Sequence, residues 1–409
     1  MSRAGALAAA AGRMPAVRGD DDPTIVLATA TVMVIAEPGD GAAGALVHAL
    51  GARRLVESLL AGDSADALAG AAADAGAEIE PAVVARALGR WLPRLDLPAA
   101  VRSVEQASRS GARLVLPGDA EWPSGLDDLG LHAPPGLWVR GTPQALAALG
   151  RSIALVGARA ATGYGEHVTT QAAAGLADRG FAIASGAAYG IDARAHRATL
   201  SSDGTTIAFL AGGVDRPYPA AHDSLLADIA ARGAVASEVP CGAAPTKWRF
   251  LQRNRLIAAA AGATVVLEAG RRSGSLNTAG HAAALGRPLG AVPGPVTSPA
   301  SAGCHRLLRE YDAVCVSDAA EMAELAGDAP NGSTAPPVLG ELSHDELRTL
   351  DALGSRALRT VEELVRRSGL GASQVRAALP GLEALGLAVV EHGRFRRASH
   401  SSSPRRRGA

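Results

Sequence analysis

Three glycine-rich turns carry the residues of this sequence that are best suited to bind an anion. They are residues 154–165 (ALVGARAATGYG), 185–192 (SGAAYGID) and 268–280 (EAGRRSGSLNTAG). Small residues let a ligand approach the backbone, and the N–H groups at the start of a helix point toward phosphate oxygens. Arg159 adds a guanidinium group that can hold a phosphate through two hydrogen bonds. A glycine after a strand can also simply supply a positive φ, but three such turns in one domain favour an anion site.

Basic residues accumulate beside these turns, although the whole chain has a formal net charge of zero. Between Pro245 and Gly274 the one acidic residue is Glu268, and the basic residues are Lys247, Arg249, Arg253, Arg255, Arg271 and Arg272. Residues 249–261 predict the start of a helix whose first turn carries three arginines, which is unfavourable unless an anion binds there. The alternative is a solvated face whose arginines pair with carboxylates from elsewhere in the fold.

A serine, an aspartate and a histidine occur together in residues 185–196, but their pattern does not predict a hydrolase. Asp192 and His196 are four residues apart and share a helix face, and Ser185 lies in the preceding turn. The G-x-S-x-G sequence that usually presents a nucleophilic serine is absent. We therefore expect Asp192 to cap the helix and His196 to pack locally, while Arg197 is the better candidate for a phosphate contact.

The spacing of apolar residues predicts an α/β fold with additional domains at both ends. From residue 110 onward, apolar runs that end in glycine or a polar residue alternate with amphipathic segments, which is typical of a Rossmann-like, doubly wound parallel sheet. The predicted parts are a disordered tail (1–22), a helical N-terminal domain (23–109), the Rossmann-like domain (110–327), a linker (328–340), a C-terminal winged helix (341–398) and a basic tail (399–409).

Composition excludes several other classes of function. Cys241, Cys304 and Cys315 show no C-x-x-C spacing, so neither a disulfide framework nor a zinc site is indicated. The P-loop sequence is absent, and we expect no metal and no other cofactor. The apolar run 24–36 is too short to span a bilayer, so we expect a cytoplasmic protein without a membrane segment.

Seven sequence blocks, in the same order, resemble the DNA processing protein A (DprA, also called Smf) family. They are EWPSGLDDLGLHAPPGLWVRG (121–141), IALVGARAATGYG (153–165), IASGAAYGIDARAHRATL (183–200), TTIAFLAGGVDRPYPAAHDSLL (205–226), SEVPCGAAPTKWRFLQRNRLIAAAA (237–261), VVLEAGRRSGSLNTAGHAAALGR (265–287) and AVPGPVTSPASAGC (291–304). The resemblance implies a cytosolic protein without enzymatic activity that binds and shields single-stranded DNA during natural transformation. It also implies that the protein helps to load the RecA recombinase and forms a homodimer through its Rossmann-like domain.

The resemblance further implies where DNA binds. In the family, the arginine of the G-[ST]-R turn and the basic residues near the R-N-R block lie in the DNA pocket. A single strand exposes phosphates and base faces, so guanidinium and N–H donors beside an aromatic ring such as Phe250 suit it; Trp248 interleaves with the same basic residues. The predicted DNA-binding residues are Gly157, Arg159, Gly186, Arg197, Lys247, Phe250, Arg253, Asn254, Arg255, Ser273, Gly274 and Ser275.

The sequence departs from the family pattern at three places. His305 stands where the family has asparagine after the G-C step, and Glu310 and Tyr311 stand near a missing G-A pair. The N-terminal helical domain also lacks the helix-hairpin-helix glycines of many relatives. These differences affect the edge of the pocket, the dimer surface and any DNA-binding role of the N-terminal domain.

One alternative function is enzymatic. Related Rossmann-like folds include phosphoribohydrolases of the LOG type, which cleave an N-glycosidic bond of a nucleotide with a glutamate in P-G-G-x-G-T-x-x-E. The nearest stretch here is residues 268–280, where Asn277 or Gly280 replaces that glutamate and Glu268 lies nearby.

A second alternative is a regulator that binds double-stranded DNA through the winged helix. Residues 373–385 form the predicted second helix of the motif, with Gln374 and Arg376 as candidate base contacts. The candidate phosphate contacts on the wing are Arg394, Arg396 and Arg397.

Overall fold

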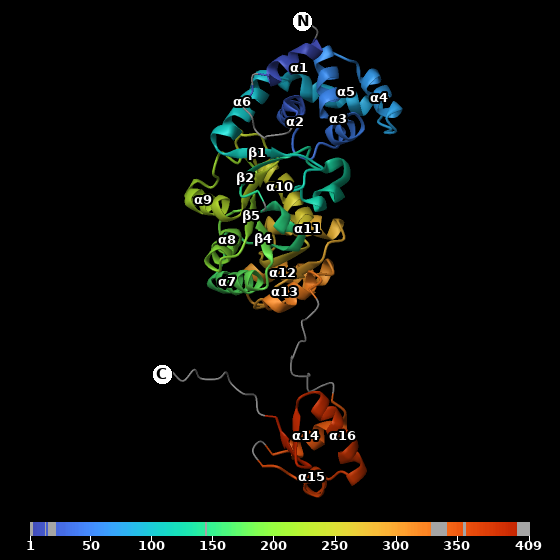
Figure 1. Ribbon diagram of the computed structural model, residues 1–409, viewed down its shortest axis with the longest axis vertical. Helices are drawn as coiled ribbons and strands as arrows, with labels where there is room; N and C mark the ends of the chain where they lie inside the picture. The colour runs from blue at the N-terminus through green and yellow to red at the C-terminus, as the bar shows by residue number, and fades with distance from the viewer. Residues whose placement is uncertain are drawn as a thin grey trace. The chain divides into compact units, whose positions relative to one another are not determined.

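The computed structural model describes residues 3–12, 14, 22–143, 145–328, 342–354 and 357–398. The chain forms two compact units, Met1–Ala329 and Pro330–Ala409, and each is described by itself (Figure 1). The first unit contains a helical region and a nine-stranded sheet, and the second contains three helices and a hairpin.

A nine-stranded sheet forms the centre of the first unit, with the order β1-β2-β6-β5-β4-β3-β7-β8-β9. Its strands are β1 (Ala112–Val115), β2 (Leu137–Gly141), β3 (Ser152–Gly157), β4 (Ala182–Ser185), β5 (Thr206–Phe209), β6 (Ala234–Ser237), β7 (Ala263–Glu268), β8 (Leu289–Ala291) and β9 (Val314–Cys315). Each strand from β6 to β9 in this order is parallel to the next one. The predicted Rossmann-like sheet is therefore confirmed. It is extended by the antiparallel strands β2 and β1, of which β1 agrees with the short strand that the sequence predicts from Arg113, whereas β2 was not expected.

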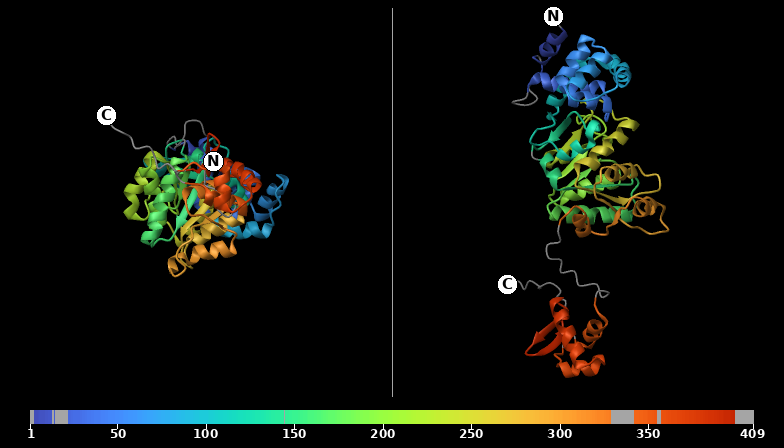
Figure 2. Two further views of the ribbon diagram at one scale, coloured as in Figure 1. Left: turned by 90° about the horizontal axis from the view of Figure 1, so that it is seen from below. Right: turned by 90° about the vertical axis from the view of Figure 1, so that its right-hand side faces the viewer.

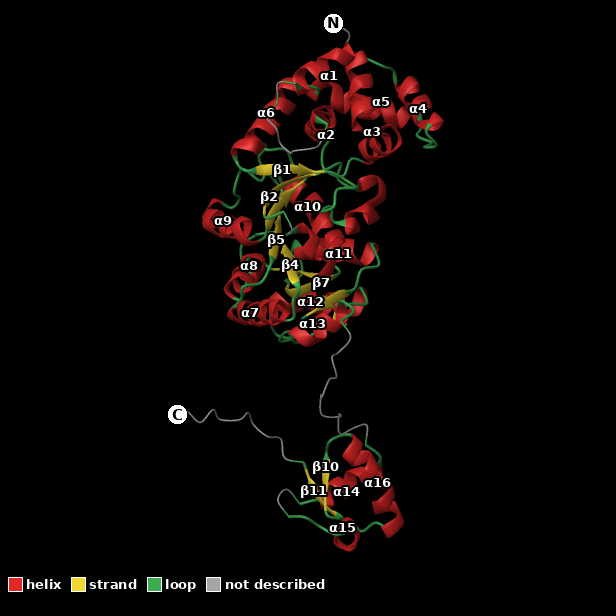
Figure 3. Cartoon of the chain, in the orientation of Figure 1, coloured by secondary structure: helices red, strands yellow, loops and turns green. Residues whose placement is uncertain are grey.

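Helices cover both faces of this sheet (Figure 3). Ile153 and Leu155 of β3 pack in one core cluster with α7 (Gly163–Asp178), α8 (Ile191–Ser201) and α13 (Ala319–Leu325). Ala154 and Val156 alternate to the other face and pack with α10 (Lys247–Ala260), α11 (Ser275–Ala284) and α12 (Ala302–Glu310). Because both faces are covered, β3 is a continuous apolar run rather than an alternating one.

The remaining elements of this part complete the layers. Helix α9 (Asp223–Arg232) packs beside β2, β5 and β6. Short 3-10 turns occur at η1 (Leu92–Arg94), η2 (Ser124–His132), η3 (Leu146–Arg151), η4 (Ala220–His222) and η5 (Pro299–Ser301).

Six helices lie together at the end of the sheet formed by β1 (Figure 2). They are α1 (Arg3–Ala11), α2 (Pro23–Ile35), α3 (Gly41–Ala61), α4 (Ala65–Asp74), α5 (Pro81–Trp91) and α6 (Leu97–Arg109). Asp22 and Asp40 accept backbone N–H groups at the starts of α2 and α3, which satisfies donors that have no partner within the helix. Helix α2 is apolar on all sides because neighbouring helices and the sheet bury most of it.

Helix α1 corrects part of the expected disordered tail at residues 1–22. Residues 3–11 form this helix because the segment is rich in alanine, the residue with the strongest helix propensity. Leu7, Ala10 and Ala11 share one face and are buried in the same cluster as α2. Residues 1–2, 13 and 15–21 lie outside the described part of the chain.

The second unit is a winged helix, as predicted. It consists of α14 (His344–Ala352), α15 (Val361–Ser368), α16 (Ala372–Ala384), β10 (Ala388–Glu391) and β11 (Arg394–Arg397). The two strands pair antiparallel around His392 and Gly393, which both adopt positive φ values as a two-residue hairpin turn requires. The predicted linker beyond residue 328 and the basic tail (399–409) lie outside the described residues.

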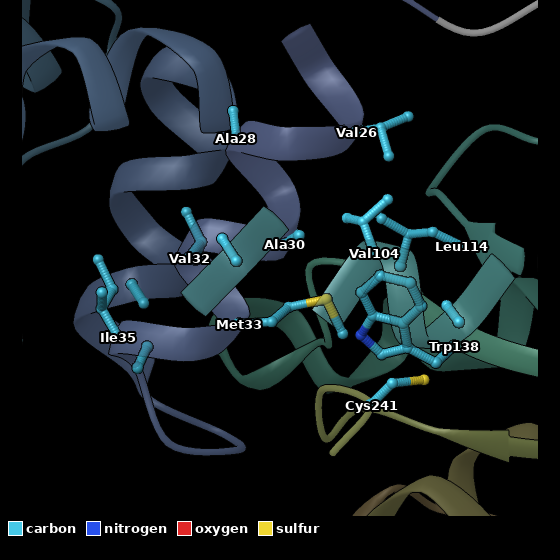
Figure 4. Packing of buried hydrophobic residues seen from close by; sticks show 14 of the residues in the cluster. Val26, Ala28, Ala30, Val32, Met33, Ile35, Val104, Leu114, Trp138 and Cys241 are labelled. Carbon is cyan, nitrogen blue, oxygen red and sulfur yellow. The ribbon is translucent and has the colours of Figure 1, made fainter. Parts of the chain in front are cut away.

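Trp138 of β2 joins the helical region to the sheet. Its indole ring is fully buried in one cluster with Met33 of α2, Val104 of α6 and Leu114 of β1 (Figure 4). The two regions therefore share a core, and the loss of this ring would leave a cavity between them.

We expect Trp138→Ala to lower the free energy of unfolding by about 3–5 kcal/mol, the usual cost of truncating a buried tryptophan. Trp248→Ala is a matched control because that side chain is 55% exposed, and we expect a change below about 0.5 kcal/mol. Urea unfolding followed by circular dichroism measures both values. Equal unfolding midpoints for the two variants would contradict a shared core.

Candidate functional site

A cleft of about 540 Å³ lies at the carboxyl ends of β3 and β7, which are neighbours in the sheet. It is lined by the turn after β3 (156–160), the turn after β7 (270–275) and one face of α10. The α10 residues in the lining are Phe250, Leu251, Arg253, Asn254 and Ile257. The cleft therefore combines turns of small residues with hydroxyl groups, cations and one aromatic ring. It lies at the edge where open parallel sheets bind ligands.

The backbone at the cleft is packed too tightly for side chains at two glycines. A Cβ atom at Gly157 would lie 2.5 Å from Cγ1 of Ile191, and one at Gly186 would lie 2.5 Å from Cζ of Arg253. Gly157 thus lets α8 approach the end of β3, and Gly186 makes room for a guanidinium group behind the cleft.

Arg159 lies in the accessible part of the cleft, above the half-buried Phe250 ring. Arg159 is exposed, and its guanidinium carbon lies 5.2 Å from the centre of the Phe250 ring. Within the described part of the chain, this guanidinium group makes no hydrogen bond and no ion pair. A cation stacked on an aromatic ring keeps its N–H donors directed outward, so it remains available for an anion.

Arg253 is buried directly below this surface. Its Nη1 donates hydrogen bonds of 2.6 Å to the carbonyl oxygens of both Gly186 and Phe209, and its Nε donates to Oδ1 of Asn254. Burial lowers the pKa of Arg253 to about 10; nearby Asp192 opposes this shift and Arg159 adds to it. The group remains a cation at neutral pH and ties α10 to the ends of β4 and β5.

Asp192 balances this buried charge. Burial raises the pKa of its carboxyl group, while Arg253 and backbone N–H groups act in the opposite direction. Its Oδ2 accepts the N–H groups of Gly186 at 3.2 Å and Ala188 at 3.4 Å. Asp192 was expected to cap α8, but Gly190 occupies the N-cap position, and Asp192 instead holds the preceding turn.

The structure gathers most of the predicted site residues in one place. Eight of them line the cleft: Gly157, Arg159, Phe250, Arg253, Asn254, Ser273, Gly274 and Ser275. Gly186 lies behind it, where its carbonyl oxygen accepts from Arg253. Arg197 and Lys247 are exposed but do not line the cleft.

The prediction that Arg255 binds DNA is corrected, because its guanidinium group is buried and paired inside the protein. It forms a buried ion pair of 2.8 Å with Glu238 and donates to the carbonyl oxygen of His132. Arg249 likewise pairs with Glu37 of the helical region. Three arginines were expected in the first turn of this helix, but α10 already begins at Lys247, so Arg253 and Arg255 lie in its later turns.

Sequence reasoning left Arg271 and Arg272 out of the predicted set, although it placed them in the basic cluster. Both are exposed and line the cleft in the turn after β7, directly before Ser273. Their position between a strand end and the predicted hydroxyl donors was the signal that could have identified them.

Ser185 and His196 are both engaged in internal hydrogen bonds, and His196 bonds locally as expected. The Ser185 hydroxyl donates to the carbonyl oxygen of Leu155, and Nδ1 of His196 lies 2.6 Å from Oγ1 of Thr206. Since the Thr206 hydroxyl donates to Ile183, it accepts from Nδ1–H of a neutral His196. Among the described residues, no group of three or more His, Cys, Asp or Glu side chains is placed to hold a metal ion.

A Rossmann-like sheet with a cationic cleft at its carboxyl edge defines a class of doubly wound proteins that place their ligand site at this edge. The family model described as DNA recombination-mediator protein A matches residues 113–327, and the DprA winged helix domain matches residues 333–394. The chain belongs to the DNA recombination-mediator protein A family.

Individual relatives agree with this assignment. A Mycobacterium tuberculosis relative that carries the DprA name is 47% identical over 320 residues, covering 74% of this chain and 81% of the relative. Protein Smf of Escherichia coli is 35% identical over 278 residues, covering 65% of this chain and 73% of that protein. The X-ray structure of DprA from Streptococcus pneumoniae is similar with a TM-score of 0.56 and 28% identity, covering 72% of this chain and 95% of that chain.

His196 makes the stability of this region dependent on pH. Burial lowers its pKa to about 3, with further contributions from His222, Arg253 and Arg197, whereas an unfolded histidine titrates near about 6.5. Between these values only the unfolded chain takes up the proton, so stability is complete above pH 6.5 and falls as the pH decreases. From pH 7 to pH 5 we expect a loss of about 2 kcal/mol from this group.

Urea unfolding at several pH values measures this loss. In His196→Asn, which keeps an amide near Nδ1, we expect a flatter dependence on pH even if the variant is less stable overall. An unchanged dependence would show that His196 does not carry the effect.

Proposed function

We propose that this protein binds single-stranded DNA in the cleft and thereby mediates recombination. The observation that carries this proposal is Arg159, an exposed guanidinium group stacked on Phe250 beside the turn that contains Ser273. Cations and hydroxyl groups suit the phosphates, and aromatic rings suit the bases of an unpaired strand. Arg271 and Arg272 add positive charge on the β7 side of the same cleft.

Two of the candidate duplex contacts of the winged helix, Gln374 and Arg396, are engaged within that domain, whereas Arg376, Arg394 and Arg397 are exposed. The Gln374 side chain accepts the N–H of Gly371 and donates to Asp345, so both ends of its amide are engaged. Arg396 of the wing is paired with Glu391. These internal contacts favour the cleft over α16 as the DNA-binding site.

The cleft favours binding over catalysis. Glu268, the candidate acid of a phosphoribohydrolase, is buried and accepts from the N–H and the hydroxyl group of Thr162 at 2.8 and 2.6 Å. It holds Thr162, the residue that caps the start of α7, and does not line the cleft. We therefore propose a non-enzymatic protein, for which incubation with AMP yields no free adenine.

We further propose that the protein acts in the cytoplasm as a homodimer and passes the bound strand to RecA. The exposed edge strand β9 supports a dimer through the Rossmann-like domain, because its Val314 and Cys315 leave the end of the sheet uncovered. The free cysteines of the protein, Cys241, Cys304 and Cys315, suit a reducing compartment such as the cytoplasm. Among the described helices, none is long and apolar enough to cross a membrane.

We expect Arg159→Ala to weaken the binding of a single-stranded oligonucleotide and to reduce the slope of log K against log salt by about one. The physical reason is the loss of one phosphate contact and of the counterion that it releases. Fluorescence anisotropy titrations at two or more salt concentrations measure both changes.

Arg151→Ala is the matched control. Arg151 lies at the opposite end of β3 and pairs with Asp328 at 2.8 Å, so we expect its replacement to leave DNA binding unchanged. Unchanged affinity and slope in Arg159→Ala would remove this arginine from the site. Equal effects of both variants would assign the change to overall charge.

A further inference from the structure

Two ring contacts, made by Phe250 with Tyr218 and by Tyr189 with His222, lie near the carboxyl edge of the sheet. The Phe250 ring lies 5.5 Å from the ring of Tyr218, centre to centre, with the planes inclined at 53°. The Tyr189 ring meets the His222 ring edge-on at 4.8 Å. We call Phe250, Tyr218 and Tyr189 the aromatic row.

The sheet order places this row on the side of the cleft away from Arg271. Strands β3, β4 and β5 are successive neighbours. Tyr189 lies in the turn after β4, and Tyr218 lies in the segment after β5. The carboxyl ends of parallel strands share one edge of a sheet, so both tyrosines lie at the edge that carries Arg159.

His222 holds the two tyrosine-bearing segments together. It belongs to η4, which follows Tyr218 and Pro219 directly, and its ring packs on Tyr189. Its Nδ1 also lies 3.0 Å from the carbonyl oxygen of Ala187 in the turn after β4. The positions of Tyr189 and Tyr218 are therefore set by a buried side chain rather than by loose loops.

The tyrosines of the row differ from the other two tyrosines. Tyr218 is 49% exposed and Tyr189 is 48% exposed, and within the described residues neither hydroxyl group makes a hydrogen bond. In contrast, the Tyr164 hydroxyl donates to the carbonyl oxygen of Pro293, and the Tyr311 ring lies under the guanidinium group of Arg306.

Phe250 itself is less available than these tyrosines. It is half-buried, and the guanidinium groups of Arg159 and Arg253 lie over its ring at 5.2 and 5.9 Å. Tyr218 is therefore the first ring of the row with a large exposed surface.

We propose that Tyr218 and Tyr189 each stack a base of the single strand whose phosphates bind beside Arg159. This inference rests on the proposed function and adds the direction in which the bound strand runs. The strand leaves the cleft toward the ends of β4 and β5. Arg216 is exposed two residues before Tyr218, and its guanidinium group has no partner among the described residues, so it can meet the phosphate of a stacked nucleotide. Because every base has a π face, the row binds without sequence preference.

The test compares two ligands on the full-length chain, an oligothymidylate and an oligonucleotide of the same length and charge whose bases are replaced by abasic sites. We expect Tyr218→Ala to weaken oligothymidylate binding about fivefold or more, the range expected from the loss of one stacked base. Its affinity for the abasic strand changes less than twofold. Tyr218→Phe keeps the ring and retains binding of both ligands.

Two further variants make the outcome unambiguous. Tyr189→Ala is expected to show the same selectivity independently, which keeps the test valid if Tyr218→Ala folds poorly. Arg151→Ala, at the opposite end of β3, is expected to bind both strands normally.

The remaining outcomes overturn either base stacking by the aromatic row or the proposed function. If the unaltered protein binds oligothymidylate but both alanine variants bind it equally well, the aromatic row is wrong and the cleft proposal stands. Equal losses on both strands would likewise overturn stacking. If the unaltered protein binds neither strand, the proposed function itself fails.

Discussion

The cleft depends on the burial of one guanidinium group. A buried cation is costly unless hydrogen bonds and a counter-charge compensate for its desolvation. Arg253 meets this constraint with the carbonyl oxygens of Gly186 and Phe209, with Asn254 and with the nearby Asp192. The same contacts fix the distance between α10 and the ends of β4 and β5, and they place Phe250 under Arg159.

The arginines of this region fall into two groups with different roles. Arg249 and Arg255 pair with Glu37 and Glu238, and Arg249 thereby connects α10 to the helical region. Arg159 is exposed and stacked instead of paired. A chain with zero net charge can thus present a local cationic surface, because its carboxylates neutralise the structural arginines and leave the cleft positive.

Much of the central domain could be predicted because apolar runs and glycine turns are local signals. Parallel strands bring their carboxyl ends to one edge, so the convergence of Arg159 with Ser273 followed from the strand assignment alone. The burial of Arg255 could not be predicted, because its partner Glu238 belongs to a different strand end and no local pattern pairs them. The antiparallel strand β2 was missed, although its apolar core LWV is similar to the runs that identified the parallel strands.

The aromatic row shows the same limit. Tyr189 and Tyr218 are far apart in the sequence, and the contact between their segments depends on the buried ring of His222. Helix α1 is a different case. Its alanine-rich sequence is compatible with a tail, and only the structure shows that Leu7 is buried in the same cluster as α2. Its stability comes from packing as well as from propensity.

The most direct test of the central claim is ultraviolet cross-linking of the protein to a single-stranded oligonucleotide that carries 5-iodouracil, followed by mass spectrometric identification of the linked peptides. The account predicts cross-links within residues 247–255 of α10 and within residues 210–222, which contain Tyr218. Cross-links confined to α16 and the β10–β11 hairpin would contradict it, because the strand would then bind to the winged helix and not to the carboxyl edge of the sheet.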